Sequence, residues 1–310
     1  MKAAQRGYDA RVSDDMLVRP PGVGAQTNSG TTVQQLTDEE INEASRRVSP
    51  RAAVVFETVR REGEQELTRS NAALAFSGLA AGLSMGFSLV ATGLFRSILP
   101  NAPWSDVVAN LGYTLGFLIV VMGRQQLFTE NTVTAIIPLL DSKDHLHMFG
   151  NVVRLWSIVI ATNLVGALLF ALLVAHSGAF SPHVKDTFLQ LGMQTLSYGF
   201  STTLIKGIFA GWLIALMVWL LPAAENSRIA VIIIITWIVG AGGLSHIIAG
   251  SVEALYAVVL GAATWSHYFV DFLLPVFIGN CVGGVLLVSI LNYAQVAPEN
   301  TEGHNGGEQP

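Results

Sequence analysis

Two long apolar stretches, each interrupted by a short polar segment, constrain the fold of this 310-residue chain more than any other feature. They lie at about 107–140 and about 229–262, and each is too long for one straight membrane helix. The interruptions are residues 126–131 (Gln-Leu-Phe-Thr-Glu-Asn) and residues 242–246 (Gly-Gly-Leu-Ser-His). Backbone groups left unpaired in a bilayer are costly, so such breaks persist only where protein or a water-filled cavity receives them. The pattern predicts two broken helices around a substrate site near the bilayer midplane.

The rest of the composition also indicates a membrane protein. Hydrophobic residues make up 51% of the chain and charged residues only 13%, about half the charge of an average soluble protein. Four further apolar segments lie at about 72–98, 149–176, 197–222 and 267–293. We therefore expect an all-α membrane protein with six transmembrane helices, of which the second and fifth are broken.

Basic residues predict the orientation in the membrane. Of the 17 Lys and Arg residues, ten lie at or before Arg69. The connection between the second and third segments carries Lys143 and Arg154, and the connection between the fourth and fifth carries Arg228. Because cytoplasmic loops are enriched in Lys and Arg, we expect both termini in the cytoplasm.

Four regions follow from this division of the chain. Residues 1–35 are polar and are expected to form a disordered cytoplasmic tail. Residues 36–70 indicate a cytoplasmic amphipathic helix that opens at a capping box and pauses at Pro50. Residues 71–294 form the channel domain, and 295–310 form a second disordered tail.

The two halves of the membrane domain share residues at a constant separation of 117 positions (240 − 123). The pairs are Gly123 and Gly240, Leu127 and Leu244, and Asn163 and Asn280. In the first and fourth segments there is almost no identity at this separation beyond Gly82 and Gly199. Since a three-helix unit has an odd number of spans, two copies must lie in opposite orientations, as in an aquaporin-like inverted 3+3 repeat. This register makes Thr129 and His246 equivalent and places both near the centre of one pore.

His246 is the sharpest candidate for chemistry. An ionisable side chain in an apolar, glycine-rich break can donate, accept or carry a proton near neutral pH. The alternative is a neutral imidazole that only holds the loop through a backbone hydrogen bond. The hydroxyl of Thr129 can bond this ring or a passing ligand.

Other residues near the breaks have two readings each. Leu127 and Phe128 either form an apolar constriction or pack the half-helix ends. Lys206, inside the fourth segment, either faces the pore as an anion attractor or pairs with Glu130 or Glu253. Arg124 and Glu130 can also pair with each other. Gly78, Gly82 and Gly86 form a small-residue stripe that serves either packing within one bundle or a contact between subunits.

The sequence offers little support for an enzyme. It contains no nucleophile–base pair, Walker loop or dinucleotide fingerprint, and its single cysteine, Cys281, excludes an intramolecular disulfide. We expect no cofactor, no metal site and no nucleic-acid partner.

Four motifs resemble those of the formate/nitrite transporter family, and the resemblance covers about 70–293. Leu127-Phe128-Thr129 after Gly123 resembles the first signature, and Ser245-His246 resembles the central-histidine motif. Residues 207–219 resemble the fourth-helix signature, and residues 280–284 resemble the sixth-helix motif. The resemblance implies a homopentamer in the bacterial inner membrane, with one pore per protomer. It implies small monovalent anions such as formate, nitrite or hydrosulfide, which gain a proton at an apolar midpoint where the histidine and threonine take part.

The chain departs from these motifs and resembles a divergent branch of the family. Gln126 replaces an acidic residue, Ser245 replaces a glutamate, Gly211 replaces an asparagine, and Glu130 stands where small residues are usual. We expect five further residues to line the pore or to act electrostatically: Lys206, Glu130, Asn131, Ser245 and Gly211.

The primary hypothesis is an inner-membrane channel or proton-linked transporter for a small weak-acid anion in contact with the lipid bilayer, with His246 as proton partner. One alternative is an aquaporin-like pore for a small neutral solute. A second is a non-conducting membrane scaffold whose N-terminal arm recruits a partner.

Overall fold

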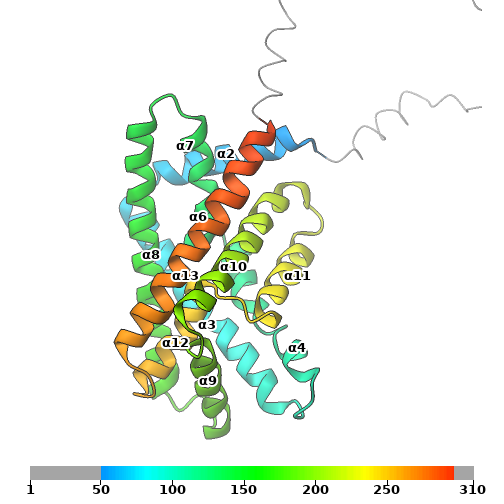
Figure 1. Cartoon of the computed structure of the whole chain (residues 1–310), viewed down its shortest axis with the longest axis vertical. Helices are drawn as coiled ribbons and strands as arrows, with labels where there is room; N and C mark the ends of the chain where they lie inside the picture. The colour runs from blue at the N-terminus through cyan, green and yellow to red at the C-terminus, as the bar shows by residue number, and fades with distance from the viewer. Residues whose placement is uncertain (1–49, 297–310) are drawn as a thin grey trace, which may run out of the picture. The chain divides into compact units, whose positions relative to one another are not determined.

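The computed structural model describes residues 50–296, and every regular element within them is a helix (Figure 1). Five helices are long and apolar enough to cross a membrane, and two shorter apolar helices accompany them. The expected all-helical membrane fold is therefore confirmed. The predicted tail 1–35, the start of the predicted amphipathic helix (36–49) and residues 297–310 lie outside the described residues.

The first half of the bundle begins with an amphipathic helix and contains the first broken span. Its elements are α2 (Ala52–Thr68), α3 (Asn71–Ile98), α4 (Ser105–Ala109), α5 (Thr114–Met122), α6 (Phe128–Thr134), α7 (Ile136–Asp141) and α8 (His145–His176). Helix α2 begins two residues after Pro50, in agreement with the expected restart of the helix there.

The second half repeats this order with a second broken span. Its elements are α9 (Pro182–Thr195), α10 (Phe200–Leu220), the 3₁₀ turn η1 (Leu221–Ala223), α11 (Arg228–Ala241), α12 (Ile247–Val259), the π-helical η2 (His267–Leu273), α13 (Leu274–Cys281) and the π-helical η3 (Val282–Ile290).

The two breaks have the same backbone conformation. Each preceding half-helix ends at a glycine, Gly123 or Gly242, and the next residue is left-handed, with φ 49° at Arg124 and 57° at Gly243. Both breaks agree with the prediction, although the first is shorter than expected, because Phe128 already opens α6. Thr129 and Glu130 thus lie in the first turn of a helix and not in a loop.

The register between the breaks differs from the predicted one. The helix-capping residues Leu127 and His246 share extended backbone angles and are 119 positions apart (246 − 127). Thr129 therefore corresponds to Ile248, and its predicted equivalence to His246 was wrong. The separation of 117 holds for Asn163 and Asn280, because the second half has two fewer residues between its break and its third helix.

Equivalent residues in the first helices of the two halves, α3 and α10, are 129 positions apart. Gly82 of α3 lies against the backbone of Asn163 in α8, and Gly211 of α10 lies against the backbone of Asn280 in α13. A Cβ atom at either glycine would overlap that backbone. Gly82 thus corresponds to Gly211 and not to Gly199. Gly78 and Gly86 also face α8, so the stripe packs within the bundle.

The repeat includes the helix that precedes each half. Gly63 of α2 lies against the carbonyl of Thr134 in α6, and Gly192 of α9 lies against the carbonyl of Glu253 in α12. Gly63 and Gly192 are 129 positions apart, as in the first helices, and Thr134 and Glu253 are 119 positions apart, as at the breaks. Figure 1 shows α2 toward one end of the bundle and α9 at the other, which supports the predicted inversion of the two halves.

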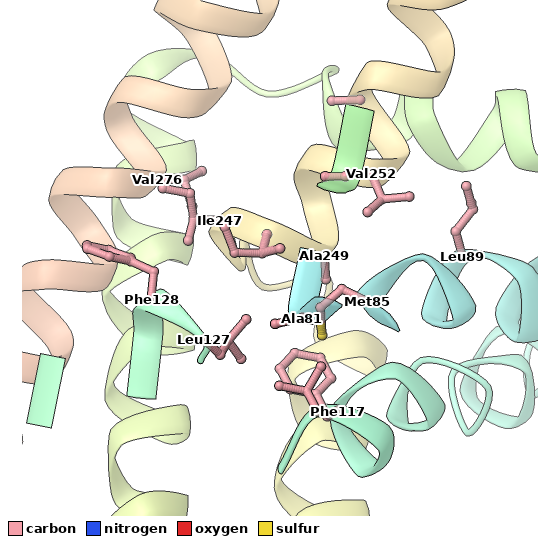
Figure 2. Packing of buried hydrophobic residues seen from close by; sticks show 14 of the residues in the cluster. Ala81, Met85, Leu89, Phe117, Leu127, Phe128, Ile247, Ala249, Val252 and Val276 are labelled. Atoms are coloured by element: carbon pink, nitrogen blue, oxygen red, sulfur yellow. The ribbon is translucent and has the colours of Figure 1, made fainter. Parts of the chain in front are cut away.

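The core lies where the two broken helices meet (Figure 2). Ala81 and Met85 of α3, Phe117 of α5 and Ile247 of α12 are fully buried there. The N-terminal ends of α6 and α12 therefore meet inside protein and not in lipid, which is the condition that a broken membrane helix requires.

Candidate functional site

Two asparagines on the third helices bind the freed backbone of the breaks. Asn163 accepts from the Phe128 N–H at 3.0 Å and donates to the carbonyls of Gly78 and Gln126 at 2.7 and 2.9 Å. Because both the carbonyl oxygen and the NH2 group of the side-chain amide are used, the break is joined to α3 and α8 in one fixed geometry.

Asn280 repeats this arrangement in the second half. It accepts from the Ile247 N–H at 3.0 Å and donates to the carbonyls of Gly207 and Ser245 at 2.8 and 2.9 Å. Both asparagines are fully buried, so these bonds replace the water that the backbone would otherwise need.

The two breaks meet at a hydrogen bond between His246 Nε2 and Thr129 Oγ1, 2.8 Å long. His246 is 0% exposed and Thr129 is 1% exposed. The hydrogen bond that the sequence suggested between these two side chains is therefore present, although the equivalence of their repeat positions does not hold. The pair joins the first turn of α6 to the residue that caps α12.

The cap fixes the tautomer of His246. Its Nδ1 accepts from the backbone N–H groups of Ile248 and Ala249 at 3.3 and 3.2 Å. A nitrogen that accepts carries no proton, so the neutral ring holds its proton on Nε2 and donates it to Thr129. A second proton on Nδ1 would face two N–H groups at the positive end of the α12 dipole. The ring is thus held as a neutral donor.

Apolar side chains surround this pair. The ring of Phe117 meets the imidazole of His246 edge-on, with centroids 4.9 Å apart. Leu127 is fully buried and points toward Phe117 and Ala81 in Figure 2. Phe128 lies on the other side of the break, where its ring packs against Trp156 and Phe277 at 5.4 and 5.5 Å. Of the two expected constriction residues, Leu127 lies toward the central pair and Phe128 does not.

A cavity of about 150 Å³ opens on one side of the central pair, and we call it the His246 cavity. His246 and Ser245 line it together with Tyr113 and Glu253. Arg96 also lines it, and its guanidinium contacts the carboxylate of Asp106 at 3.2 Å. This is a polar chamber that ends at the buried imidazole.

A second cavity, of about 520 Å³, lies beside the first break and includes residues of α2; we call it the Glu66 cavity. Three glutamates, Glu62, Glu66 and Glu130, face three arginines, Arg69, Arg124 and Arg228, around it. The residues that line the two cavities do not overlap. Thr129 and Leu127 line neither of them, so buried side chains separate the two chambers.

Helix α2 contributes two of the three carboxylates of the Glu66 cavity, Glu62 and Glu66. Glu66 accepts from Gln126 at 3.1 Å, from Asn131 at 3.0 Å and from Thr134 at 2.5 Å. Gln126 thus binds a carboxylate in place of supplying one. Neither Glu66 nor Thr134 was a predicted site residue, because their proximity follows only from the packing of α2 on α6.

The expected pairing of Arg124 with Glu130 was wrong. The guanidinium of Arg124 binds Glu62 of α2 at 3.2 Å. Glu130 lines the Glu66 cavity, and its buried Oε1 has no hydrogen-bond partner in the described part of the chain. Asn131 is buried and bonds Gln126 and Glu66, so it braces the wall of this cavity.

Lys206 also pairs with neither predicted carboxylate. Its Nζ donates to the carbonyl of Gly243 at 2.9 Å and lies 3.6 Å from the ring centroid of Tyr198. The ammonium thus compensates the carbonyl end of α11 at the second break. Gly211 lines neither cavity, because it packs on the backbone of Asn280, so the pore-lining role predicted for it was wrong.

The sequence of the chain is similar to that of known membrane proteins. Residues 53–294 match the family model described as formate/nitrite transporter. The chain is 42% identical over 250 residues to the inner membrane protein YfdC of Escherichia coli K12, which covers 81% of this chain and 80% of YfdC.

Two solved structures share the fold. The structure titled as an FNT family ion channel superposes with a TM-score of 0.66 at 17% identity, over 78% of this chain and 98% of that one. The structure titled as a pentameric formate channel with formate bound has a TM-score of 0.62 at 19% identity, over 77% and 99%. Together with the two braced breaks and the central polar pair, these matches show that the chain belongs to the formate/nitrite transporter family.

Proposed function

We propose that the chain is a channel or proton-linked transporter for a small monovalent weak-acid anion, and that the anion crosses the centre as its neutral acid. The observation that carries this proposal is the division of the path by the buried Thr129–His246 pair between two polar cavities. A path of this form admits ions to both chambers and places a dry step between them.

The physics of that dry step favours the neutral species. Moving a carboxylate-sized ion from water into a medium of low dielectric constant costs of order 20 kcal/mol in the idealised limit. Protonating an acid of pKa near 4 at pH 7 costs about 4 kcal/mol, at 1.36 kcal/mol per pH unit. Protonation is the smaller cost, so a small acid crosses as the neutral molecule unless water fills the constriction.

The central pair is suited to binding such a molecule. The Nε2–H of His246 and the hydroxyl of Thr129 supply a donor and a group that both donates and accepts. Leu127 and Phe117 exclude larger or more hydrated solutes. In this proposal His246 acts as a neutral hydrogen-bond donor. It does not take up the proton, as the sequence suggested, because its Nδ1 already accepts from the two N–H groups of the cap.

The assembly and location belong to the same proposal. We infer a homopentamer with one pore per protomer in the bacterial inner membrane. One protein with the same fold is a pentameric formate channel, and YfdC is named as an inner membrane protein. Exposed apolar side chains on α3, α8 and α10, such as Phe76, Leu173 and Ile205, suit a surface that meets lipid or neighbouring subunits. The distribution of Lys and Arg along the chain supports a cytoplasmic location for both termini.

The test is a stopped-flow panel of formate, nitrite, bicarbonate, acetate and glycerol with the full chain in liposomes from pH 5 to 8. We expect flux of the small weak acids that rises as pH falls, and no flux of glycerol. Glycerol flux without anion flux would instead support a neutral-solute pore.

The variant His246→Gln separates the two roles of the ring, because a glutamine amide donates and accepts without titrating. With His246 as a neutral donor, the variant keeps a pH-dependent flux that is reduced several-fold. A flux that loses its pH dependence would show that the ring itself carries the proton. His183→Gln, at a position that lines neither cavity, is the matched control.

A further inference from the structure

Each cavity contains one carboxyl group hydrogen-bonded to a threonine, at equivalent positions of the repeat. Thr134 of α6 donates to Glu66 of α2, and Thr195 of α9 donates to Glu253 of α12, both at 2.5 Å. By the separations of 129 and 119 positions, Glu66 corresponds to Thr195 and Thr134 to Glu253. The two halves thus make the same contact with the carboxyl and the hydroxyl exchanged.

The two carboxyl groups differ in how many bonds they make. Both oxygens of Glu66 accept, from three different side chains. Glu253 accepts only from Thr195, through Oε2, within the described residues. Its other oxygen is therefore available to a molecule in the His246 cavity, which Glu253 lines. Glu66 fastens α2 to the first break, whereas Glu253 is fixed by one bond and open to the chamber.

The chamber around Glu253 contains a second polar group without a partner. Thr92 is 2% exposed and lines the same cavity, and its hydroxyl has no hydrogen-bond partner in the described part of the chain. Buried hydroxyls are seldom left unpaired, so this group indicates a bound molecule or water. The volume of about 150 Å³ holds about five waters at 30 Å³ each, or one small acid with a few waters.

The other charged and titratable groups that face this cavity are engaged elsewhere or neutral. Arg96 of α3 binds Asp106 at the start of α4 and Gln194 of α9. His246 is held as the neutral tautomer by the two N–H groups that its Nδ1 accepts from. Two tyrosines, Tyr113 and Tyr198, also line the cavity. No cation within the described residues forms an ion pair with Glu253, so the side chain is free to exchange a proton.

We propose that Glu253 is the proton-exchange group of the transport path. This inference rests on the proposed function, and it places the proton transfer on a carboxyl group and not on His246. The anion enters the His246 cavity past Arg96. The O–H bond of the Glu253 carboxylic acid breaks and an O–H bond forms on the anion, which gives a neutral acid and a Glu253 carboxylate held by Thr195.

The cycle balances in protons and charge. The neutral acid moves past the Thr129–His246 pair and loses its proton to water in the Glu66 cavity. The Glu253 carboxylate regains a proton from water on its own side. One anion and one proton cross together, and outward transport follows the same steps in reverse.

The test is the pH dependence of formate flux for Glu253→Gln, measured with a pH-sensitive dye inside liposomes. Glutamine keeps the shape of the side chain and can still accept from Thr195, but it cannot transfer a proton. We expect the flux of the variant to be at least tenfold below wild type at pH 7. Its remaining flux should follow the neutral acid in bulk solution, with a tenfold fall per pH unit, whereas the wild-type flux falls less steeply.

Further variants make the outcome specific. Glu253→Asp keeps a carboxyl group and should recover part of the wild-type flux and its shallow pH profile. Asp186→Asn, an exposed carboxylate on α9 that lines neither cavity, is the matched control and should behave as wild type. A Glu253→Gln variant with wild-type flux and slope would overturn the inference. Absence of anion flux in the wild type would instead overturn the proposed function.

Discussion

Asn163 and Asn280, on the third helices of the two halves, make the same three hydrogen bonds to the two breaks. Each accepts from the N–H of the first residue of a half-helix and donates to one carbonyl within the break and one on the first helix of its half. The breaks at the centre of the path therefore depend on one buried side chain each. Both should be sensitive to loss of an amide group.

Replacement of either asparagine by leucine should destabilise the protein by about 2–5 kcal/mol, since three bonds are lost and backbone groups remain buried without partners. The unfolding temperature in detergent measures the loss. Asn292→Leu is the control, because within residues 50–296 the amide of Asn292 bonds only the Val288 carbonyl one turn earlier. This substitution should shift the unfolding temperature little. Equal shifts at the buried and control positions would contradict the bracing role.

Gly82→Val and Gly211→Val should prevent assembly of a stable fold, because the added atoms overlap the backbones of Asn163 and Asn280. Overpacking of this kind costs about 1–3 kcal/mol or more per site.

Gly150→Ala in α8 is the opposite case, since nothing lies within 4 Å of the added Cβ. Alanine there should stabilise by about 0.5–1 kcal/mol. Size-exclusion chromatography and unfolding temperature distinguish these outcomes.

Arg124 and Gly243, the left-handed residues of the two breaks, should each be more stable as glycine than as alanine. Gly243→Ala should destabilise by about 1 kcal/mol, because alanine at φ 57° is strained. At the equivalent Arg124, both glycine and alanine remove the ion pair with Glu62. Arg124→Gly should nevertheless be about 1 kcal/mol more stable than Arg124→Ala. If the two Arg124 variants unfold at the same temperature, the strain is absent.

The docking of α2 should weaken as pH rises. Burial raises the pKa of Glu66 above its ordinary value of 4.5, and the hydrogen bond from Thr134 opposes that shift. A raised folded pKa means that the folded state binds the proton more tightly, so this stabilisation is complete below pH 4.5 and is lost as pH rises through the folded pKa. Hydrogen exchange of the α2 amides from pH 5 to 8, corrected for intrinsic rates, should show decreasing protection.

Two variants check the origin of this effect. Glu66→Gln should make α2 protection independent of pH over the same range. Glu57→Gln should leave the pH trend unchanged, because hydrogen bonding to Arg60 lowers the pKa of Glu57 to about 2 and the group stays ionised above pH 5. A trend that persists in Glu66→Gln would assign the effect to another group.

The family, the apolar segments, the two breaks and the contact between Thr129 and His246 could all be predicted from the sequence. Apolar runs and polar interruptions are local properties, and a histidine in such a break is conspicuous because it is costly there. The repeat register could not be read correctly. Helix contacts in a membrane select small or apolar residues and few particular ones, so the match of Leu127 with Leu244 arose without structural equivalence.

The sequence by itself determined where the chain leaves its helices and which polar residues lie at those points. Only the tertiary structure decided what those residues contact: Arg124 with Glu62, Lys206 with the Gly243 carbonyl, and Glu253 with Thr195. Each of these contacts joins segments far apart in the chain, and it depends on the depth and rotation of two packed helices. A side chain's type fixes what it can bind, whereas the packing of the helices fixes which partner lies within reach.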